Sequence, residues 1–117
     1  MLKMGKIYLT NSFSLNMLND NFKGNVFIQR NISLNDVKKI LENGFINAVG
    51  HDATIQLINT LLNLNLKANR VAIKMVKNDV AIIVQIKERL PEGKILNENE
   101  IKTLYESNKI QFDLVEV

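Results

Sequence analysis

Short runs of β-forming residues, separated by polar turns, predict several strands along the chain. KIYLTN at residues 6–11 and NVFIQR at residues 25–30 predict two of them. The stretch between them, SFSLNMLND, predicts a loop or a single helical turn. FINAV at residues 45–49 predicts a short extended piece, and IQFDLVEV at residues 110–117 predicts a closing strand.

Two other stretches carry hydrophobic residues at helical spacing and predict helices over residues 34–43 and 52–63. The capping signals of NENEIKTLYESN predict a third helix within residues 97–108. Ser33 is a suitable N-cap for the first helix, because its hydroxyl can accept a free N–H of the first turn. Asn97 is the expected N-cap residue of the third helix. Glu100 lies three residues after Asn97, which is the spacing of a capping box.

The sequence around Asn78 and Asp79 predicts a β-hairpin. RVAIKMV at residues 70–76 and VAIIVQIKERL at residues 80–90 read as strands on either side of this turn-forming pair. Strands and helices interleave along the chain, yet a hairpin excludes a purely parallel sheet. We therefore predict an α/β (α+β) fold in one domain spanning residues 1–117, with a mixed sheet of about five strands flanked by helices.

The composition favours a folded protein without a metal. The chain has 117 residues, 46% of them hydrophobic, and no cysteine, which excludes a disulfide framework and a thiolate metal site. With one histidine and no tight cluster of Asp and Glu, we expect no metal and no other cofactor. No apolar run is long enough to span a membrane and the start lacks a signal peptide, so we expect a cytoplasmic protein.

The net charge of +3 is compatible with an anionic ligand, although such a charge is equally common on ordinary domains. Most of the basic residues are lysines, and the arginines are Arg30, Arg70 and Arg89. The planar fork of arginine suits phosphate better than the point charge of lysine, so each arginine merits examination as a phosphate contact.

His51, the only histidine, lies between Gly50 and Asp52 at the predicted start of a helix. A helix N-terminus offers free N–H groups and a positive dipole end to an anion, and Gly50 would let the backbone approach such a ligand closely. A histidine there could exchange a proton with a phosphate ester oxygen. The dipole disfavours imidazolium, so an acid role requires a nearby anion such as the substrate phosphate or Glu92. The alternative is a histidine that only packs or hydrogen-bonds at the helix start.

Gln85 and Arg89 fall on one face of the second hairpin strand, and Glu92 lies in the loop after it. Arg70 begins the partner strand, so the arginines and Glu92 would form a charged cluster near the open end of the hairpin. If His51 faces that cluster, the set combines an acid, a phosphate clamp and a carboxylate. Such a set suits RNA cleavage in which a ribose 2′-hydroxyl attacks its own phosphorus, because no metal or protein nucleophile is required. For Gln85, the alternative is an ordinary solvated strand face.

Nearly the whole chain resembles the viral anti-CRISPR ring nucleases, small proteins of archaeal viruses and phages with bacterial relatives. Five blocks occur in the same order and at similar spacing: TNSFSLNML, INAVGHDATIQLINTLL, NRVAIKM, QIKERLPEGKIL and IKTLYESNKIQF. The block around GHDATIQLIN, together with the block that contains RLPEG, makes the resemblance specific.

The resemblance implies an enzyme that cleaves cyclic tetra-adenylate, the second messenger of type III CRISPR systems, without a metal. The implied products are linear di-adenylates that end in a 2′,3′-cyclic phosphate, and their formation suppresses the defence signal. It also implies a homodimer that binds the ring across the subunit interface, acts in the host cytoplasm and engages no long nucleic acid. A ring of four phosphates with two-fold symmetry suits such an interface.

The resemblance assigns His51 as the general acid and Arg89 as the arginine that contacts the phosphate at the cut. It assigns Glu92 as the acidic residue that supports either that acid or the attacking hydroxyl. It assigns substrate contacts to Asn11, Ser14, Arg70 and Gln85. For Asn11 and Ser14 the alternative is turn capping. Pro91 is a departure from the family pattern, and by fixing the backbone it could change where Glu92 points.

Two functions of other classes stay open. A protein that binds and sequesters the cyclic nucleotide would need the same contacts but no general acid. A small nucleic-acid-binding regulator would use the positive charge, yet the sequence has neither a recognisable helix-turn-helix nor an aromatic stacking stripe.

Overall fold

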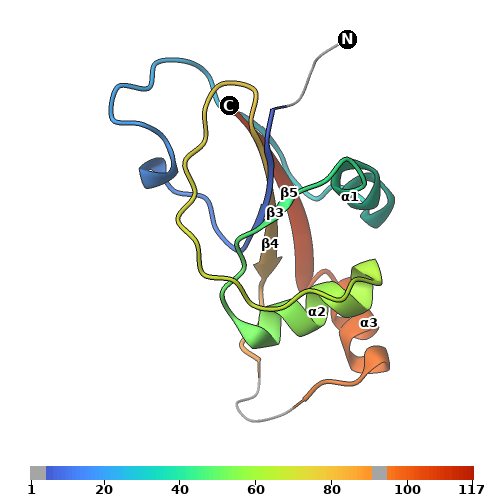
Figure 1. Ribbon diagram of the computed structural model, residues 1–117. Helices are drawn as coiled ribbons and strands as arrows, with labels where there is room; N and C mark the ends of the chain where they lie inside the picture. Colours follow the sequence, from blue (N-terminus) through green and yellow to red (C-terminus); the bar gives the residue numbers. More distant parts are fainter. Residues whose placement is uncertain (1–4, 91–94) are drawn as a thin grey trace.

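The computed structural model describes residues 5–90 and 95–117, and within them the strands form one five-stranded sheet (Figure 1). The strands are β1 (Ile7–Thr10), β2 (Phe27–Gln29), β3 (Ile46–Asn47), β4 (Val80–Ile86) and β5 (Ile110–Glu116). Their order across the sheet is β2-β5-β4-β1-β3. β1 is parallel to β3 and β4, whereas β5 is antiparallel to β2 and β4, so the prediction of a mixed sheet in an α+β fold is confirmed.

The predicted helices are present as α1 (Leu34–Leu41), α2 (Asp52–Leu62) and α3 (Glu98–Glu106), and the predicted single turn is the 3₁₀ helix η1 (Leu15–Met17). The local signals that mark the helix starts act as expected. The Ser33 hydroxyl accepts the N–H of Asp36 at 3.1 Å. The capping box is complete, because Asn97 Oδ1 accepts the N–H of Glu100 at 2.8 Å and Glu100 Oε1 accepts the N–H of Asn97 at 3.2 Å.

β4 is buried on both faces, which divides the core into two layers. Ile82 and Val84 belong to the cluster beneath the helices, whereas Ala81 and Ile83 belong to a second cluster on the opposite face. Figure 1 shows α1, α2 and α3 on one side of the sheet, and the chain around η1 and the strand-free 64–78 segment on the other. The second layer is therefore covered by irregular chain rather than by helices.

The predicted hairpin is wrong, although its turn is present. Asn78 has a positive φ of 79°, and the N–H of Asp79 donates to the carbonyl of Val76 at 2.9 Å. Residues 70–76 do not form a strand and make only an isolated parallel bridge between Met75 and Leu18. They cannot pair with β4 because β1 and β5 already occupy both of its edges.

Asp79, which is 2% exposed, joins three distant parts of the chain at the start of β4. Its carboxylate accepts the N–H of Lys6 at 2.8 Å and the N–H of Val76 at 2.9 Å. Its carbonyl accepts the N–H of Val117 at 3.1 Å. The carboxylate therefore links the beginning of β1 to the turn before β4, and the backbone carbonyl of Asp79 links that turn to the end of the chain.

We expect Asp79→Ala to lower the free energy of unfolding by about 2–4 kcal/mol, because two backbone N–H groups lose a charged acceptor in a buried place. Urea unfolding followed by circular dichroism measures the change. Asp79→Asn keeps the shape and one acceptor oxygen, so its loss should be smaller. Equal stability of the Ala variant and the wild type would contradict this role for Asp79.

Candidate active site

The carboxyl ends of β1, β3 and β4 lie at the same edge of the sheet, because these three strands are parallel. The chain that leaves each of them carries residues for which the sequence predicts a functional role. Asn11 follows β1, Gly50 and His51 follow β3, and Gln85 lies near the end of β4. Loops at this edge of a sheet are the usual place for ligand binding in folds with parallel strands.

His51 is the N-cap residue of α2, with extended backbone angles of φ −114° and ψ 125°. Its carbonyl accepts the N–H of Ile55 at 3.0 Å, but its side chain does not cap the helix. The imidazole is exposed, and among the described residues it has no hydrogen-bond partner. The ring is therefore available to a ligand beside the free N–H groups of the first turn.

Gly50 allows Arg70 to lie against the backbone next to His51. A Cβ atom at Gly50 would lie only 2.5 Å from Cγ of Arg70, and Arg70 Nε donates to the carbonyl of Gly50 at 3.4 Å. The φ angle of Gly50 is outside the left-handed region, so its backbone does not itself require glycine. The absence of a side chain at Gly50 is thus needed for the position of Arg70.

His51 and Arg70 line an open hollow of about 410 Å³. The full lining, called the His51 hollow below, consists of Asn11, Ala48, Gly50, His51, Arg70, Val71 and Ala72. Four residues predicted from the sequence are therefore brought together here: Asn11, Gly50, His51 and Arg70. An imidazole and a guanidinium on the wall of one hollow can together bind an anion and deliver a proton to it.

Asparagine side chains hold the 64–78 segment against β3 and thereby place Arg70. Asn69 Nδ2 donates to the carbonyl of Asn47 at 2.8 Å, and Asn47 Nδ2 donates to the carbonyl of Lys67 at 2.8 Å. The backbone N–H of Asn69 donates to the carbonyl of Val49 at 2.8 Å. These bonds replace the ladder that a strand would have made. Sequence reasoning missed both asparagines, because asparagine is abundant throughout the chain.

Gln85 does not line the His51 hollow but belongs to a polar network on β4, β5 and the chain after β2. Its Oε1 accepts a hydrogen bond from Arg30 at 3.2 Å, and Arg30 Nε is 3.1 Å from a carboxylate oxygen of Asp113. Burial raises the pKa of Asp113, but hydrogen bonds from Gln111 and Asn31 and the Arg30 guanidinium outweigh it and leave this pKa below its ordinary value. Asp113 is therefore a charged acceptor, and its carboxylate holds Arg30 in place by an ion pair.

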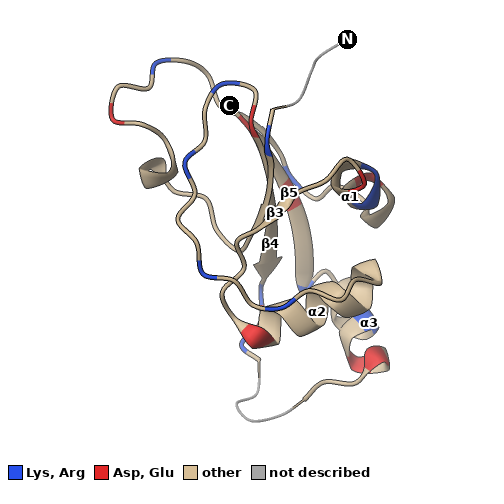
Figure 2. Cartoon of the chain, viewed as in Figure 1, with Lys and Arg blue, Asp and Glu red and all other residues tan. Residues whose placement is uncertain are grey.

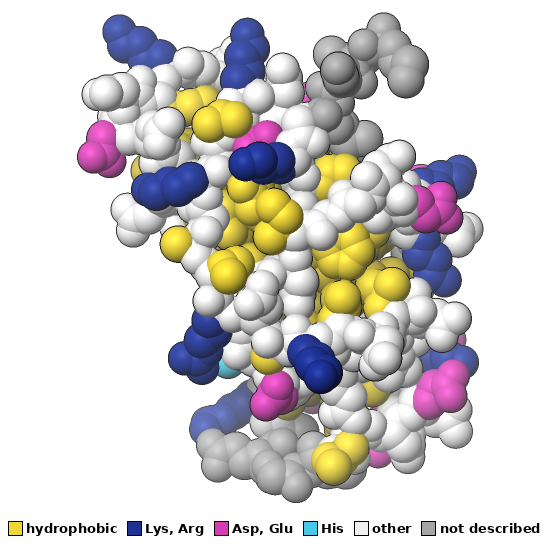
Figure 3. Space-filling view, viewed as in Figure 1, with side chains coloured by type: hydrophobic (Ala, Val, Ile, Leu, Met, Phe, Trp, Pro, Cys, Tyr) yellow, Lys and Arg dark blue, Asp and Glu magenta, His cyan; other side chains and the backbone are white. Residues whose placement is uncertain are grey.

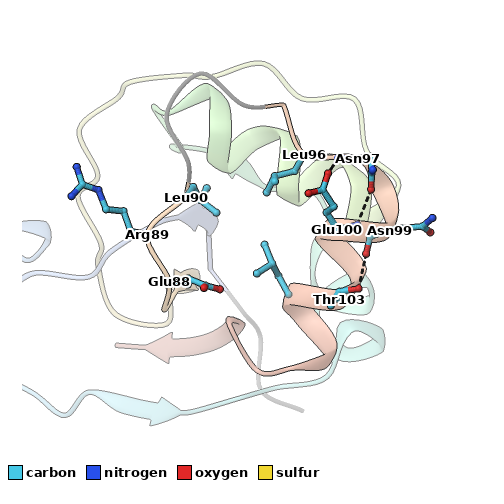
Figure 4. Close-up of a pocket in the computed structure, with 9 residues that line it drawn as sticks. Glu88, Arg89, Leu90, Leu96, Asn97, Asn99, Glu100 and Thr103 are labelled. Atoms are coloured by element: carbon cyan, nitrogen blue, oxygen red, sulfur yellow. Dashed lines mark hydrogen bonds between the residues drawn. The ribbon is translucent and has the colours of Figure 1, made fainter.

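The other predicted residues lie outside the hollow or outside the described residues. Ser14 is the N-cap residue of η1, where its carbonyl accepts the N–H of Met17 at 3.0 Å, and it does not line the His51 hollow. Arg89 adjoins a second cavity of about 460 Å³ between the end of β4 and α3, but its side chain points away from that cavity (Figure 4). Glu92 lies outside the described residues.

Positive charge gathers along the 64–78 segment, which contains Lys67, Arg70, Lys74 and Lys77 and no acidic residue. Figure 2 shows these blue positions spread along the segment on one side of the sheet, and Figure 3 shows basic side chains above and below the cyan histidine. No group of metal-ligating side chains is found in residues 5–90 and 95–117. Within the same ranges, no helix has the length and apolar character needed to cross a bilayer.

Comparisons with known proteins identify viral relatives. The family model described as STIV B116-like matches residues 7–114. The uncharacterized protein ORF116 of Acidianus filamentous virus 1 is 38% identical over 104 residues, which cover 89% of each chain. Uncharacterized protein 26 of Sulfolobus islandicus filamentous virus is 30% identical over 109 residues, or 92% of this chain and 86% of that protein.

Among solved structures, B116 of Sulfolobus turreted icosahedral virus is similar with a TM-score of 0.85 and 43% sequence identity. The match covers 97% of this chain and 100% of that chain, so it extends over the sheet, the helices and the His51 hollow. The relatives come from viruses of Acidianus and Sulfolobus, in agreement with the resemblance of the sequence to a family of viral proteins.

We expect Asn69→Ala to loosen the part of the 64–78 segment that carries Arg70, because the mutation removes a hydrogen bond worth about 0.5–1.5 kcal/mol. Limited trypsin digestion with mass spectrometry should show faster cleavage after Lys67 and Arg70 than in the wild type. Asn43→Ala is the matched control, since Asn43 also donates from its amide to backbone carbonyls, at the end of α1. Unchanged cleavage in Asn69→Ala would show that the segment is held by other contacts.

Proposed function

This chain belongs to the STIV B116-like family, and from that premise we propose that it is a metal-independent ring nuclease that cleaves cyclic tetra-adenylate. The products are linear di-adenylates with a 2′,3′-cyclic phosphate at one end. Removal of this messenger suppresses type III CRISPR signalling in the host cytoplasm. The support is the motif order along the chain and the chemistry of the His51 hollow.

The observation that carries the proposal is the placement of His51. Its imidazole is exposed at the N-terminus of α2, makes no cap and has no partner among the described residues, and it lines a hollow together with Arg70. A histidine that served only to cap or pack would use its ring nitrogens within the fold. A bound phosphate beside the imidazole favours its protonated form, which is the form that a general acid needs.

The proposed step needs few groups from the protein. The 2′-hydroxyl of one ribose gives its proton to solvent water and attacks the adjacent phosphorus while the P–O5′ bond breaks. His51 donates a proton to the leaving O5′, which becomes a free hydroxyl, and the attacking oxygen completes the 2′,3′-cyclic phosphate. Arg70 offsets the negative charge that develops on the phosphate oxygens. Arg89 and Glu92 keep the roles predicted for them: Arg89 contacts the phosphate, and Glu92 supports the acid or the attacking hydroxyl.

A homodimer that holds the ring between two copies of the His51 hollow fits the symmetry of the substrate. A ring of four phosphates has a two-fold axis, and an isologous interface would present the same acid to two of its phosphates. Two cuts would then give two di-adenylates, with no long nucleic acid involved. The basic 64–78 segment beside the hollow supports an anionic ligand of this kind.

The test is to incubate the purified protein with cyclic tetra-adenylate in EDTA and to separate the products by chromatography. We expect cleavage by the wild type, and we expect His51→Ala and His51→Asn to lose about 10²–10⁴ in single-turnover rate. His51→Asn is the matched variant, because asparagine is a good N-cap and keeps the helix start while removing the acid.

Full activity of either His51 variant, or no cleavage by the wild type, would overturn the proposal. Tight binding of the ring by a wild type that does not cut it would instead favour a sequestering protein. Binding of DNA that weakens with salt, without any response to the ring, would favour a nucleic-acid regulator.

We expect Gly50→Ala to lower kcat/KM by about 10–100-fold, because the new methyl group occupies the space of the Arg70 stem and displaces a group that offsets charge. In the Gly50→Ala background, Arg70→Ala should cause little additional loss. Gly24→Ala is the matched control, since it also adds a methyl group, beside the Phe22 ring in a surface loop, and should retain activity. Independent, additive losses from Gly50→Ala and Arg70→Ala would contradict this coupling.

A further inference from the structure

Asp113 is the centre of a polar network on the sheet face opposite the helices. Its side chain is 5% exposed and accepts the backbone N–H of Asn31 and Nε2 of Gln111, each at 2.8 Å, in addition to its ion pair with Arg30. A buried carboxylate with three donors is a fixed anchor. Arg30, whose own side chain is 60% exposed, is therefore held at its Nε end while its remaining N–H groups reach outward.

The outward end of Arg30 sets the orientation of the Gln85 amide. The guanidinium has only donors, so Gln85 must present its Oε1, which accepts from Arg30 at 3.2 Å. A flipped amide would place an NH₂ group against the guanidinium and lose the bond. The two N–H donors of Gln85 therefore face away from Arg30.

Gln85 lies at the edge of the sheet where the proposed substrate would bind. Ile83 pairs with Thr10, the last residue of β1, so the final residues of β4 extend beyond β1. Gln85 shares a face of β4 with Ile83, which packs in the cluster on the side of the 64–78 segment. Arg70, which lines the His51 hollow, belongs to this same 64–78 segment.

We propose that Arg30, anchored by Asp113, is a positioning residue that fixes the Gln85 amide so that it donates to an acceptor atom of the bound nucleotide. The inference rests on the proposed function. Phosphate oxygens and the ring nitrogens of adenine accept hydrogen bonds, whereas the adenine amino group donates. The network thus selects which part of the nucleotide Gln85 can recognise, without Arg30 or Asp113 touching it.

A double-mutant cycle tests this arrangement. The dissociation constant for cyclic tetra-adenylate is measured by calorimetry with Arg30→Met, Gln85→Ala and the double variant, each in the His51→Asn background to prevent turnover. We expect each single change to weaken binding by about 5–30-fold, and the double variant to bind no more weakly than the weaker single variant. Additive losses, or no effect of Arg30→Met, would overturn the proposal.

Three further measurements separate positioning from a general structural role. With His51 intact, Arg30→Met should raise KM and leave kcat within about twofold, because the acid lies in the His51 hollow. Gln85→Glu should bind the ring no better than Gln85→Ala, because a carboxylate can still pair with Arg30 but has no donor. Lys102→Met is the control, since it removes an exposed 2.9 Å ion pair with Glu98 on α3 and should change none of these values.

The two side-chain amide proton resonances of Gln85 give a readout that needs no ligand. We expect their chemical shifts to differ from those of a freely exposed glutamine in the wild type and to move to such values in Arg30→Met, as the amide loses its fixed orientation. Unchanged resonances would overturn the positioning role. Failure of the wild type to bind the ring would overturn the proposed function and, with it, the ligand assigned to Gln85. Ring binding with an additive cycle would overturn the positioning role alone.

Discussion

The rest of the structure depends on the burial of β4 on both faces and along both edges. A strand whose side chains are apolar on both sides needs a cover on each face, and its backbone needs a partner on each edge. β1 and β5 supply the edges, one parallel and one antiparallel, and the helices supply one cover. β1 is parallel to both β3 and β4, so the carboxyl ends of these three strands lie at one edge of the sheet.

The face of β4 opposite the helices is covered mainly by irregular chain, and part of that chain forms one wall of the candidate site. The 64–78 segment contributes Ile73 and Met75 to the core while its basic residues stay at the surface. Because the segment has no ladder, the side chains of Asn47 and Asn69 supply part of its hydrogen bonding. The irregular segment held in this way brings Arg70 against Gly50. The same feature that makes the hairpin prediction wrong thus builds one wall of the His51 hollow.

Two polar groups at the same sheet edge divide the work that the proposed reaction requires. The His51 hollow combines a free imidazole with a guanidinium, which suits proton transfer and charge neutralisation at a phosphate. The network of Asp113, Arg30 and Gln85 is linked by an ion pair and a hydrogen bond, and the proposed orientation of the Gln85 donors suits recognition. A separation of this kind allows binding and chemistry to be altered independently by mutation. Arg30 and Arg70 would then have different roles. Arg30 contacts the Gln85 amide, whereas Arg70 lines the hollow beside His51, the proposed acid.

The sequence by itself determined the features that depend on a few neighbouring residues. Helical periodicity located α1 and α2, the cap at Ser33 marked the start of α1, and the capping box of Asn97 and Glu100 located α3. The position of His51 at the start of α2 could also be read directly, since a helix start is a local event. The turn at Asn78 was read correctly for the same reason.

Only the tertiary structure decided which segments pair and which side chains meet. The hairpin prediction was wrong because segments distant in sequence compete to pair with a strand. β1 and β5 pair with the two edges of β4, which leaves none for residues 70–76. Gly50 and Arg70 are 20 residues apart, and Arg30 and Gln85 are 55 apart, so no spacing rule relates them. Such contacts depend on the register of the sheet and on the path of an irregular segment across it. Local patterns determine where each element begins and ends, whereas these contacts arise only after the elements have packed.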